Sequence, residues 1–543
     1  QLPEVDDLCI YNILQKLRIL NGQFLSYRNL EVEQIGSVYE ALMGLQIERA
    51  EGPSVALTKD RIVVDLLHLR NIEKPHEFLK GILDKDLNYI KKHFAMIDTW
   101  KPSTNQEEDV QQLKEILSSQ TMESLISIGC HYLQGAPNRR WSGSHYTPRS
   151  LSEPIVRKTI DPVLGENPTP EKILSLKVCD PAMGSAAFLA EACRYLGDKL
   201  VEAWSRSGSY PQVKEQDDWT FVARRMIAER CLYGVDKNPK AVQLARLSMW
   251  LVISAKDVPF TFLDHNLKYG DAVVGCTKKQ ISTFDLEGVK TKQIFLKQGN
   301  ISTQKAGVQR NLNLSDTKNV SNNTAKMMLH ENRKTLTNSE IHAQKEKIIG
   351  DLLIACLWQG GTKREKNQRL TRIRDEIEGN VRELSDEASF LLFSLYNGAF
   401  GFIPFHWEIE FPEIFEKENP GFDVIVGNPP FMGKNTLSKS SGPTYAPLLG
   451  RLFPHVHGNS DLYVYFFLKV STHLLARNGC AGLISSSSIN QGENRRSGLH
   501  HMIVKQSVEL YDVTQEMVWP VFGANVVISV THFMKGNWTA QKY

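Results

Sequence analysis

The sequence predicts an α/β protein whose core is a doubly wound, largely parallel β-sheet. From about residue 174, short apolar strands alternate with amphipathic helices, and this alternation is typical of parallel sheets. Three of these strands end at an aspartate: Asp180, Asp236 and Asp271. A fourth ends in Asn428-Pro429-Pro430, where two successive prolines cannot continue a ladder. Because ligands bind at the carboxyl ends of strands in open α/β sheets, these positions predict a binding site.

Length and composition limit the class of protein. At 543 residues the chain is too long for one hydrophobic core, so two or three domains are expected. The formal net charge of +3 is close to zero, so any affinity for nucleic acid must come from local basic patches. The eight cysteines show no C-x-x-C spacing, which argues against a zinc site and indicates a reducing, cytoplasmic compartment. No apolar run reaches transmembrane length, so no membrane partner is expected.

The texture of the chain predicts four regions. Residues 1–140 are expected to form a mostly helical N-terminal domain, because stretches such as 109–129 carry apolar residues at three- and four-residue spacing. Residues 141–285 and 399–543 are expected to form the two halves of the sheet domain. Residues 286–398 separate these halves as a basic, partly disordered and helical insertion.

Seven strands are expected in the sheet domain, each a short run rich in apolar and β-branched residues. The predicted strands are 176–180, 231–236, 267–271, 423–427, 481–487, 508–513 and 525–533. Apolar residues at helical spacing predict three helices between them. These helices are 186–204, 239–255 and 461–479.

The insertion has an unusual composition. Residues 290–347 hold eleven Lys and Arg against four Asp and Glu, with much Asn, Thr, Ser and Gln. This composition is typical of a solvated, partly disordered segment. A basic arm that contacts phosphate groups is the alternative. Residues 340–398 carry a helical pattern.

Three loops at the strand ends predict a pocket for an adenosine-bearing ligand. The loop DPAMGSAAFLAEA (180–192) combines small residues with a helix start, so a ligand can approach the backbone. It lacks G-x-G-x-x-G and G-K-[ST], which disfavours a dinucleotide or a nucleoside triphosphate. Asp236 could accept both hydroxyls of a ribose, or could simply cap the next helix. Asp271 could accept from the amine of an adenine, or could belong to a plain turn.

The tetrapeptide Asn428-Pro429-Pro430-Phe431 adds reactive chemistry to the same edge of the sheet. The prolines fix the backbone, so the Asn428 side-chain oxygen and the Pro429 carbonyl are acceptors with fixed directions. An amine whose two hydrogens are held by separate acceptors becomes more pyramidal, and its lone pair becomes more available. Phe431 offers a flat face for stacking a heterocycle. A plain strand-terminating turn is the alternative.

With these motifs in this order, the chain resembles the N6-adenine DNA methyltransferases of the gamma arrangement. It is most similar to the methylase part of type IIG restriction–modification and related phage-defence proteins, over roughly residues 144–533. SHYTPRSLSEPIV (144–156) resembles the motif before the first strand, DPAMGSAAF the cofactor loop and NPPF the catalytic tetrapeptide. Residues 27–43 resemble a stretch upstream of such methylases, and Ala186 stands where the family usually has glycine.

The resemblance implies a Rossmann-like, seven-stranded mixed sheet whose last strand is antiparallel. It also implies S-adenosyl-L-methionine as the cofactor, no metal, and double-stranded DNA whose target adenine is flipped out, so that its amine can attack the sulfonium methyl. The implied catalytic residues are Asn428, Pro429, Pro430 and Phe431. The implied cofactor-binding residues are Tyr146, Thr147, Pro148, Asp180, Pro181, Ala182, Gly184, Ser185, Phe188, Asp236 and Asp271.

Other functions remain open at this point. Asn-Pro-Pro followed by an aromatic residue also serves methyltransferases that act on RNA or on protein glutamine, and a catalytically dead DNA-binding scaffold is a third alternative. Because the chain starts at Gln1 and ends about ten residues after the last predicted strand, we expect a fragment of a longer protein. A target-recognition domain or subunit, and a nuclease of the same system, are the expected partners.

Overall fold

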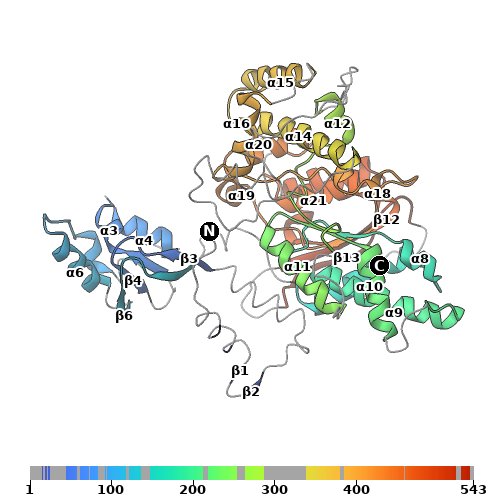
Figure 1. The fold of residues 1–543 in the computed structure, drawn as a ribbon, viewed down its shortest axis with the longest axis horizontal. Helices are drawn as coiled ribbons and strands as arrows, with labels where there is room; N and C mark the ends of the chain where they lie inside the picture. Colours follow the sequence, from blue (N-terminus) through green and yellow to red (C-terminus); the bar gives the residue numbers. More distant parts are fainter. Residues whose placement is uncertain are drawn as a thin grey trace. The chain divides into compact units, whose positions relative to one another are not determined.

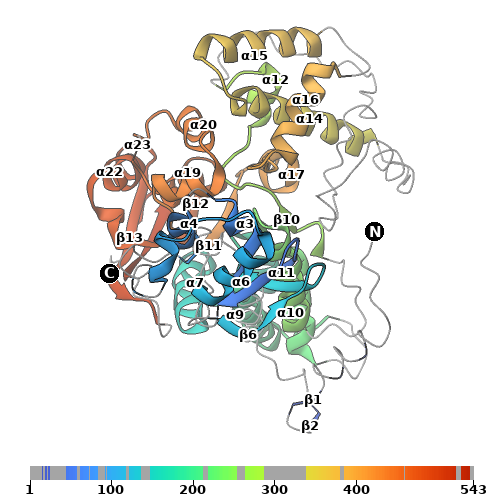
Figure 2. The ribbon, with the colours of Figure 1, turned by 90° about the vertical axis from the view of Figure 1, so that its left-hand side faces the viewer.

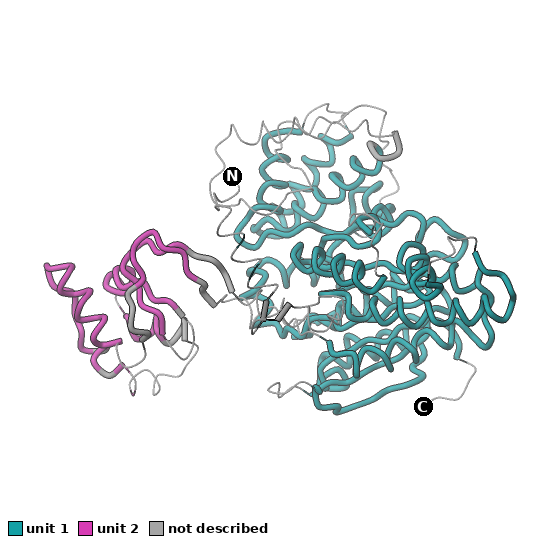
Figure 3. The backbone as a smooth tube through the Cα atoms, turned by 60° about the horizontal axis from the view of Figure 1, so that its bottom comes forward, with its two compact units in different colours: residues 1–36, 144–543 teal, residues 37–143 magenta. Residues whose placement is uncertain are grey.

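The protein, seen in a computed structural model, divides into two compact units: residues 37–143, and residues 1–36 together with 144–543 (Figure 3). Apart from Lys92 and a few positions before residue 45, the described residues are 45–57, 62–72, 74–83, 94–117, 121–135, 147–211, 218–253, 263–286, 338–378, 384–457, 459–520 and 527–538. Tyr146, the stretch 27–43 and most of the basic stretch 290–347 lie outside them.

The larger unit is built on a seven-stranded sheet, and all seven predicted strands are present. The strands are β8 Val178–Asp180, β9 Leu232–Asp236, β10 Leu267–Tyr269, β11 Phe422–Gly427, β12 Leu475–Ser486, β13 Val508–Val518 and β14 Val527–Lys535. Their order in the sheet is β10-β9-β8-β11-β12-β14-β13. The last strand, β14, pairs antiparallel with both β12 and β13, whereas the other pairings are parallel. The expectation of a mixed sheet with an antiparallel last strand is confirmed.

Helices cover both faces of this sheet, because successive strand residues point to opposite sides. Val178 and Val424 belong to one buried cluster, and their neighbours Cys179 and Ile425 belong to another. On the Val178 face the sheet packs against helices from the first half of the chain, which lie together in Figure 1. These helices are α7 Arg149–Leu164, α8 Pro170–Ser175, α9 Ala187–Ser207, α10 Trp219–Arg230 and α11 Pro239–Val252.

The Cys179 face is covered by helices that follow β10 along the chain. Residues of these helices share one continuous apolar cluster with the sheet. They are α12 Lys278–Thr283, α14 Asn338–Trp358, α15 Lys363–Glu378, α16 Asp386–Asn397, α17 Trp407–Glu410, α18 Pro412–Phe415, α19 Lys434–Ser441, α20 Tyr445–Leu452, α21 Leu462–Lys469 and α23 His501–Lys505. The short α22 Gly492–Asn494 precedes α23.

The helical part of the expected insertion is integrated into this core. Helices α14, α15 and α16 confirm the helical pattern of residues 340–398. Every residue from Ile349 to Trp358 is buried, so this part of α14 is enclosed on all sides. Inside it, Asp351 accepts hydrogen bonds from His406 Nε2 at 3.0 Å and from Tyr396 Oη at 2.5 Å. The α14 segment is therefore a structural element of the sheet domain and not an appendage.

The predicted helix 461–479 is too long at its C-terminal end. Helix α21 continues into a π-helical turn, Val470–Leu474, and β12 begins at Leu475. Leu475 pairs with Phe422 of β11, so its long-range pairing overrides the local helical spacing. None of the described helices combines the length and the apolar character needed to cross a bilayer.

The smaller unit contradicts the expectation of a mostly helical N-terminal domain. Its described residues form two antiparallel sheets, β5-β4-β6 and β3-β7. The strands are β3 Leu45–Arg49, β4 Ser54–Leu57, β5 Ile62–Asp65, β6 Thr121–Ile126 and β7 His131–Gly135. The helices are α3 Leu66–Arg70, α4 Pro75–Leu83 and α6 Gln106–Leu117. The helical spacing of residues 109–129 holds only as far as Leu117, where α6 ends, since the next apolar run is β6, which pairs with β4.

Candidate active site

The four strands β10, β9, β8 and β11 are neighbours in the sheet, so the loops that follow them lie along one edge. The chain order reverses between β8 and β11, where the first and fourth strands are side by side. Crevices at such a reversal are the usual ligand sites of open α/β sheets. The predicted residues Asp180, Asp236, Asp271 and Asn428 all follow these four strands.

The loop after β8 is anchored on β9. Met183 donates its backbone N–H to the Val235 carbonyl at 3.1 Å, and Gly184 donates its N–H to Asp236 Oδ2 at 2.9 Å. Gly184 has φ +52°, and a Cβ at this position would meet no atom within 4 Å. A glycine here leaves backbone and space accessible to a ligand.

Ala186 adopts the left-handed conformation that explains the family preference for glycine. Its φ is +68° and its ψ +31°, and it directly precedes α9. An alanine in this conformation costs about 1–2 kcal/mol relative to the right-handed region. The loop nevertheless closes, because Ala186 donates its N–H to the Met183 carbonyl at 2.7 Å.

Other residues predicted from the cofactor loop have different environments. Pro181 is buried, whereas Ala182 and Ser185 are half-buried beside the crevice. Phe188 is 2% exposed and belongs to the apolar cluster beneath α9. Its surroundings support a packing role for the ring.

Asp180 is an unusual buried carboxyl. It is 1% exposed; Oδ1 accepts from the Ala182 N–H at 3.0 Å, and Oδ2 has no partner among the described residues. Burial raises the pKa of Asp180 to about 8. The hydrogen bond from Ala182 lowers the pKa, and the negative charge of Asp236 adds a smaller increase. A Cβ on Gly427 would lie 2.7 Å from Asp180 Oδ1, so the carboxyl lies directly beside the end of β11. A cationic ligand would favour loss of the carboxyl proton, and Oδ2 would then be an acceptor for that ligand.

We expect Asp180→Asn to stabilise the ligand-free protein and to flatten its pH dependence. With the folded pKa raised to about 8 from the usual 3.8, the folded state holds a proton that the unfolded state has lost, so stability falls as pH rises between these values. The amide has no such penalty, and the gain at pH 8 should be at most about 5 kcal/mol. Urea denaturation from pH 4 to pH 9 measures it. The exposed Asp375→Asn is the control, and an unchanged pH profile in Asp180→Asn would contradict the assignment.

Asp236 joins two loops at this edge. Its Oδ1 accepts from the Asn238 N–H at 2.7 Å and its Oδ2 accepts from the Gly184 N–H at 2.9 Å. Burial raises the pKa of Asp236, and these two hydrogen bonds oppose the rise. Each oxygen keeps a lone pair for a further donor. The following helix is capped by Asn238, which accepts from Lys240 N–H at 3.0 Å, so the cap does not require Asp236.

Asp271 is fully occupied by protein donors. Oδ1 lies 3.2 Å from each of the backbone nitrogens of Val273 and Val274, while Oδ2 accepts from Tyr445 Oη at 2.6 Å and pairs with Lys237 Nζ at 2.9 Å. The Lys237 ammonium also lies 4.2 Å from the centre of the Tyr445 ring. Sequence reasoning missed both partners: Lys237 is adjacent to Asp236, but Tyr445 follows Asp271 by 174 residues.

Asn428 has one satisfied and one unsatisfied side-chain group. Its Nδ2 donates to Thr147 Oγ1 at 3.2 Å, and Thr147 is 5% exposed. Its Oδ1 is buried without a hydrogen-bond partner among the described residues. Pro148, next to Thr147, is the N-cap residue of α7, so the motif before the first strand lies against the tetrapeptide. An orphaned buried acceptor is costly, which favours a ligand donor at this position.

The rest of the tetrapeptide is held by a polar network that the sequence did not reveal. Pro429 is buried, Pro430 is half-buried, and the half-buried Phe431 contacts Tyr463 edge-to-face at a centroid distance of 6.1 Å. Asn494 Nδ2 donates to Tyr463 Oη at 2.8 Å and to Asp461 Oδ2 at 3.0 Å. These residues carry no recognisable motif, and only the fold brings them behind Phe431.

Comparison with known families identifies similar proteins. The sequence model of the family described as "Eco57I restriction-modification methylase" matches residues 230–519, just over half of the chain. The model described as "N-6 DNA Methylase" matches residues 134–268. Together the two matches include Asp180, Asp236, Asp271 and Asn428.

Two curated relatives cover different shares of the chain. RM.MjaORFECS2P of Methanocaldococcus jannaschii, a candidate type II restriction enzyme and methyltransferase, is 22% identical over 477 residues, or 76% of this chain and 36% of that protein. The type II restriction enzyme and methyltransferase RM.Eco57I of Escherichia coli is 26% identical over 159 residues, or 26% of this chain and 16% of that protein. The chain thus spans little more than a third of the first relative.

Solved structures give weaker similarities. The type IIL restriction-modification enzyme MmeI, in complex with DNA, is 14% identical, with a TM-score of 0.35 over 74% of this chain and 38% of that chain. The M protein of the type I restriction enzyme EcoKI is 12% identical, with a TM-score of 0.31 over 98% of this chain and 60% of that chain.

Proposed function

Since the chain belongs to the Eco57I restriction-modification methylase family, we propose that it transfers a methyl group from S-adenosylmethionine to the N6 amine of an adenine in DNA. The observation that carries this proposal is that Asn428 Oδ1 and Asp180 Oδ2 are both buried without a hydrogen-bond partner among the described residues, at the ends of the adjacent strands β11 and β8. One is an acceptor for a neutral amine and the other for a cationic ligand. Restriction–modification or phage defence is the proposed biological setting.

The donors and acceptors at the strand ends fit S-adenosylmethionine. When bound, this cofactor supplies an electrophilic methyl group. Asp180 would accept from or neutralise its positively charged part, Asp236 would accept from the ribose hydroxyls, and the glycine loop at Gly184 would admit the chain of the methionine. Asp271 would meet the adenine amine, provided that one of its present donors moves.

The tetrapeptide would hold and orient the target base. Thr147 fixes the amide of Asn428, since it accepts from Nδ2 and leaves Oδ1 as the group that faces the amine. The two prolines hold this acceptor and the Pro429 carbonyl in fixed directions, and such preorganisation is the main source of catalysis in sites of this type. Phe431 would stack on the adenine after the base leaves the duplex.

The direct test is methyl transfer by the whole 543-residue chain. We expect radiolabelled S-adenosylmethionine to label duplex DNA and mass spectrometry of the digested product to show N6-methyladenine. Labelled RNA or labelled protein without labelled DNA would instead favour another target. Cofactor binding by calorimetry, without DNA, tests the pocket separately. A target-recognition domain or subunit and a nuclease are the proposed partners.

We expect Lys237→Met to tighten cofactor binding. The Lys237 ammonium occupies Asp271 Oδ2, so a ligand amine must compete with it. A partly exposed ion pair is worth about 0.2–1 kcal/mol, and its removal should strengthen binding by up to about fivefold. Calorimetric titration with S-adenosylmethionine measures the change. Lys240→Met, an exposed lysine in the first turn of α11, is the control, and weaker binding in Lys237→Met would mean that Lys237 itself contacts the cofactor.

A further inference from the structure

Helix α15 has its charges arranged against its own dipole. Its first ten residues, 363–372, contain five Lys and Arg and one Glu, whereas its last six contain one Arg and three Asp and Glu. Cations near a helix N-terminus and anions near its C-terminus interact unfavourably with the helix dipole. This arrangement opposes helix stability, so the basic end has another use.

Two of the five cations have a structural role in the fold. Lys366 Nζ donates to the Leu357 carbonyl at 2.9 Å, and Arg369 Nη1 donates to the Cys356 carbonyl at 2.9 Å. These bonds satisfy the free carbonyls at the end of α14. Glu365 is the one acidic residue among these ten. It accepts from the Thr362 N–H at 2.6 Å and so stabilises the start of the helix.

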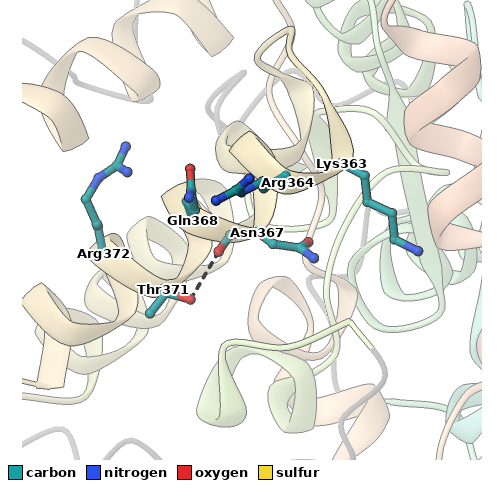
Figure 4. Close-up of a pocket in the computed structure, with 6 residues that line it drawn as sticks. All are labelled: Lys363, Arg364, Asn367, Gln368, Thr371 and Arg372. Atoms are coloured by element: carbon teal, nitrogen blue, oxygen red, sulfur yellow. Dashed lines mark hydrogen bonds between the residues drawn. The ribbon is translucent and has the colours of Figure 1, made fainter.

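The remaining three cations lie on a separate face of α15 and do not bond the carbonyls of α14. Lys363 and Arg364 have no ion pair or side-chain hydrogen bond with any described residue, and Arg372 pairs with Glu387 at 2.6 Å. These three line a shallow, open surface region whose other lining residues are Asn367, Gln368 and Thr371. Figure 4 shows the side chains on successive turns of one helix face, with Lys363 and Arg372 at opposite ends and Thr371 bonded to the Asn367 carbonyl.

The six lining residues include no carboxylate, but Glu387 pairs with Arg372, so Lys363 and Arg364 carry the positive charge that suits an extended polyanion. From residue 363 to 372 the face runs about 13 Å, at about 1.5 Å per residue. A DNA strand presents one phosphate charge per about 3.4 Å of helix axis, so several phosphates can lie along it. The uncharged lining residues include the side-chain amides of Asn367 and Gln368, a residue type that contacts phosphate without reading sequence. In Figure 2, α15 lies at the outer end of the helices that cover one face of the sheet, where a long ligand can reach it.

We propose that this face of α15, comprising Lys363, Arg364, Asn367, Gln368 and Arg372, is a binding surface for the phosphate backbone of duplex DNA. It contributes affinity independent of sequence and holds the duplex beside the methylase domain. This inference rests on the proposed function, since the same chain must bind DNA to methylate it. It adds a contact surface remote from the strand ends.

The test compares two double variants of the whole chain. The first is Lys363→Gln with Arg364→Gln; the control is Arg230→Gln with Arg477→Gln, two exposed arginines near the amino ends of strands β9 and β12. Binding of a fluorescent 30-base-pair duplex is measured between 50 and 200 mM NaCl. In the first variant the slope of log K against log salt should become shallower by about 1.8, twice the 0.9 of one phosphate contact. The control should keep the parent slope.

Several results would overturn the proposal. One is the parent slope in the first variant, and another is an equal change in the control. Tight binding of polyglutamate, lost in the first variant, would identify an acidic protein segment as the occupant. A lower melting temperature in that variant would show a structural role, since loss of cations at a helix start should leave stability unchanged or raised. Methyl transfer with an unchanged salt slope would retain the proposed function and reject this surface.

Discussion

Asn428→Ala should lower the rate of methyl transfer by about 10²–10³ and leave cofactor affinity nearly unchanged. The expected loss is that of one preorganised polar group at a reacting centre. Asn428 Oδ1 is a buried acceptor without a partner among the described residues, whereas the residues expected to hold the cofactor lie at or just after the ends of β8, β9 and β10. Single-turnover methylation gives the rate, and calorimetry gives the affinity. Asn397→Ala, an exposed asparagine at the end of α16, is the matched control.

Further substitutions at the tetrapeptide separate catalysis from a plain turn. Asn428→Asp and Asn428→Gly are both good turn residues, so a turn without chemistry would tolerate them, while a catalytic amide would not. Phe431→Ala should weaken retention of the base by about 1–3 kcal/mol, the value of one stacking contact. Phe431→Tyr and Phe431→Trp should retain much of the activity. Parent-level methylation by Asn428→Ala would refute the catalytic assignment.

Asp351→Ala should destabilise the sheet domain by about 3–5 kcal/mol. His406 Nδ1 accepts from the Cys276 N–H at 2.9 Å, so the ring proton lies on Nε2, which donates to Asp351. Removing the carboxylate leaves buried donors on His406 and Tyr396, and each charge-assisted hydrogen bond is worth about 1.5–3 kcal/mol. Urea denaturation followed by tryptophan fluorescence measures the change in free energy of unfolding.

The matched control for this prediction is Asp375→Ala on α15. Asp375 is exposed, so its removal should change stability by less than about 0.5 kcal/mol. If Asp351→Ala cost less than about 1 kcal/mol, the network would not hold α14 to the core. Asp351→Asn should lie between the two, since the amide keeps one acceptor and places a donor against the other.

The sequence predicted the sheet well because strand periodicity and strand-end residues are local signals. Seven strands were identified, and Asp180, Asp236 and Asn428 do lie at neighbouring strand ends. Local signals do not predict the secondary structure of segments whose conformation depends on pairing with a distant part of the chain. The smaller unit was predicted to be mostly helical, since short apolar runs such as 62–65 show no clear periodicity until they pair with another strand.

The site shows the same division between local and long-range information. That Asp271 ends a strand is a local signal, but the hydrogen bond that its Oδ2 accepts comes from Tyr445, 174 positions later in the chain. The contact of Phe431 also comes from a later segment: Tyr463 on α21, whose hydroxyl accepts from Asn494 on α22. A run of polar residues gives no sign that it will be buried, so this network could not be predicted from composition or spacing.

The order of the strands has a consequence for synthesis on the ribosome. Strand β8 lies in the interior of the sheet, yet its partner β11 is encoded about 246 residues later, as in the pair Lys177 and Asp423. At about 5–20 residues per second, the nascent chain waits roughly 12–50 s with that edge of β8 unpaired. An unpaired, apolar strand edge is a template for aggregation. Expression of this protein should therefore depend on chaperones that bind nascent chains. Lower growth temperatures slow translation, so they should lengthen the period during which these chaperones are needed.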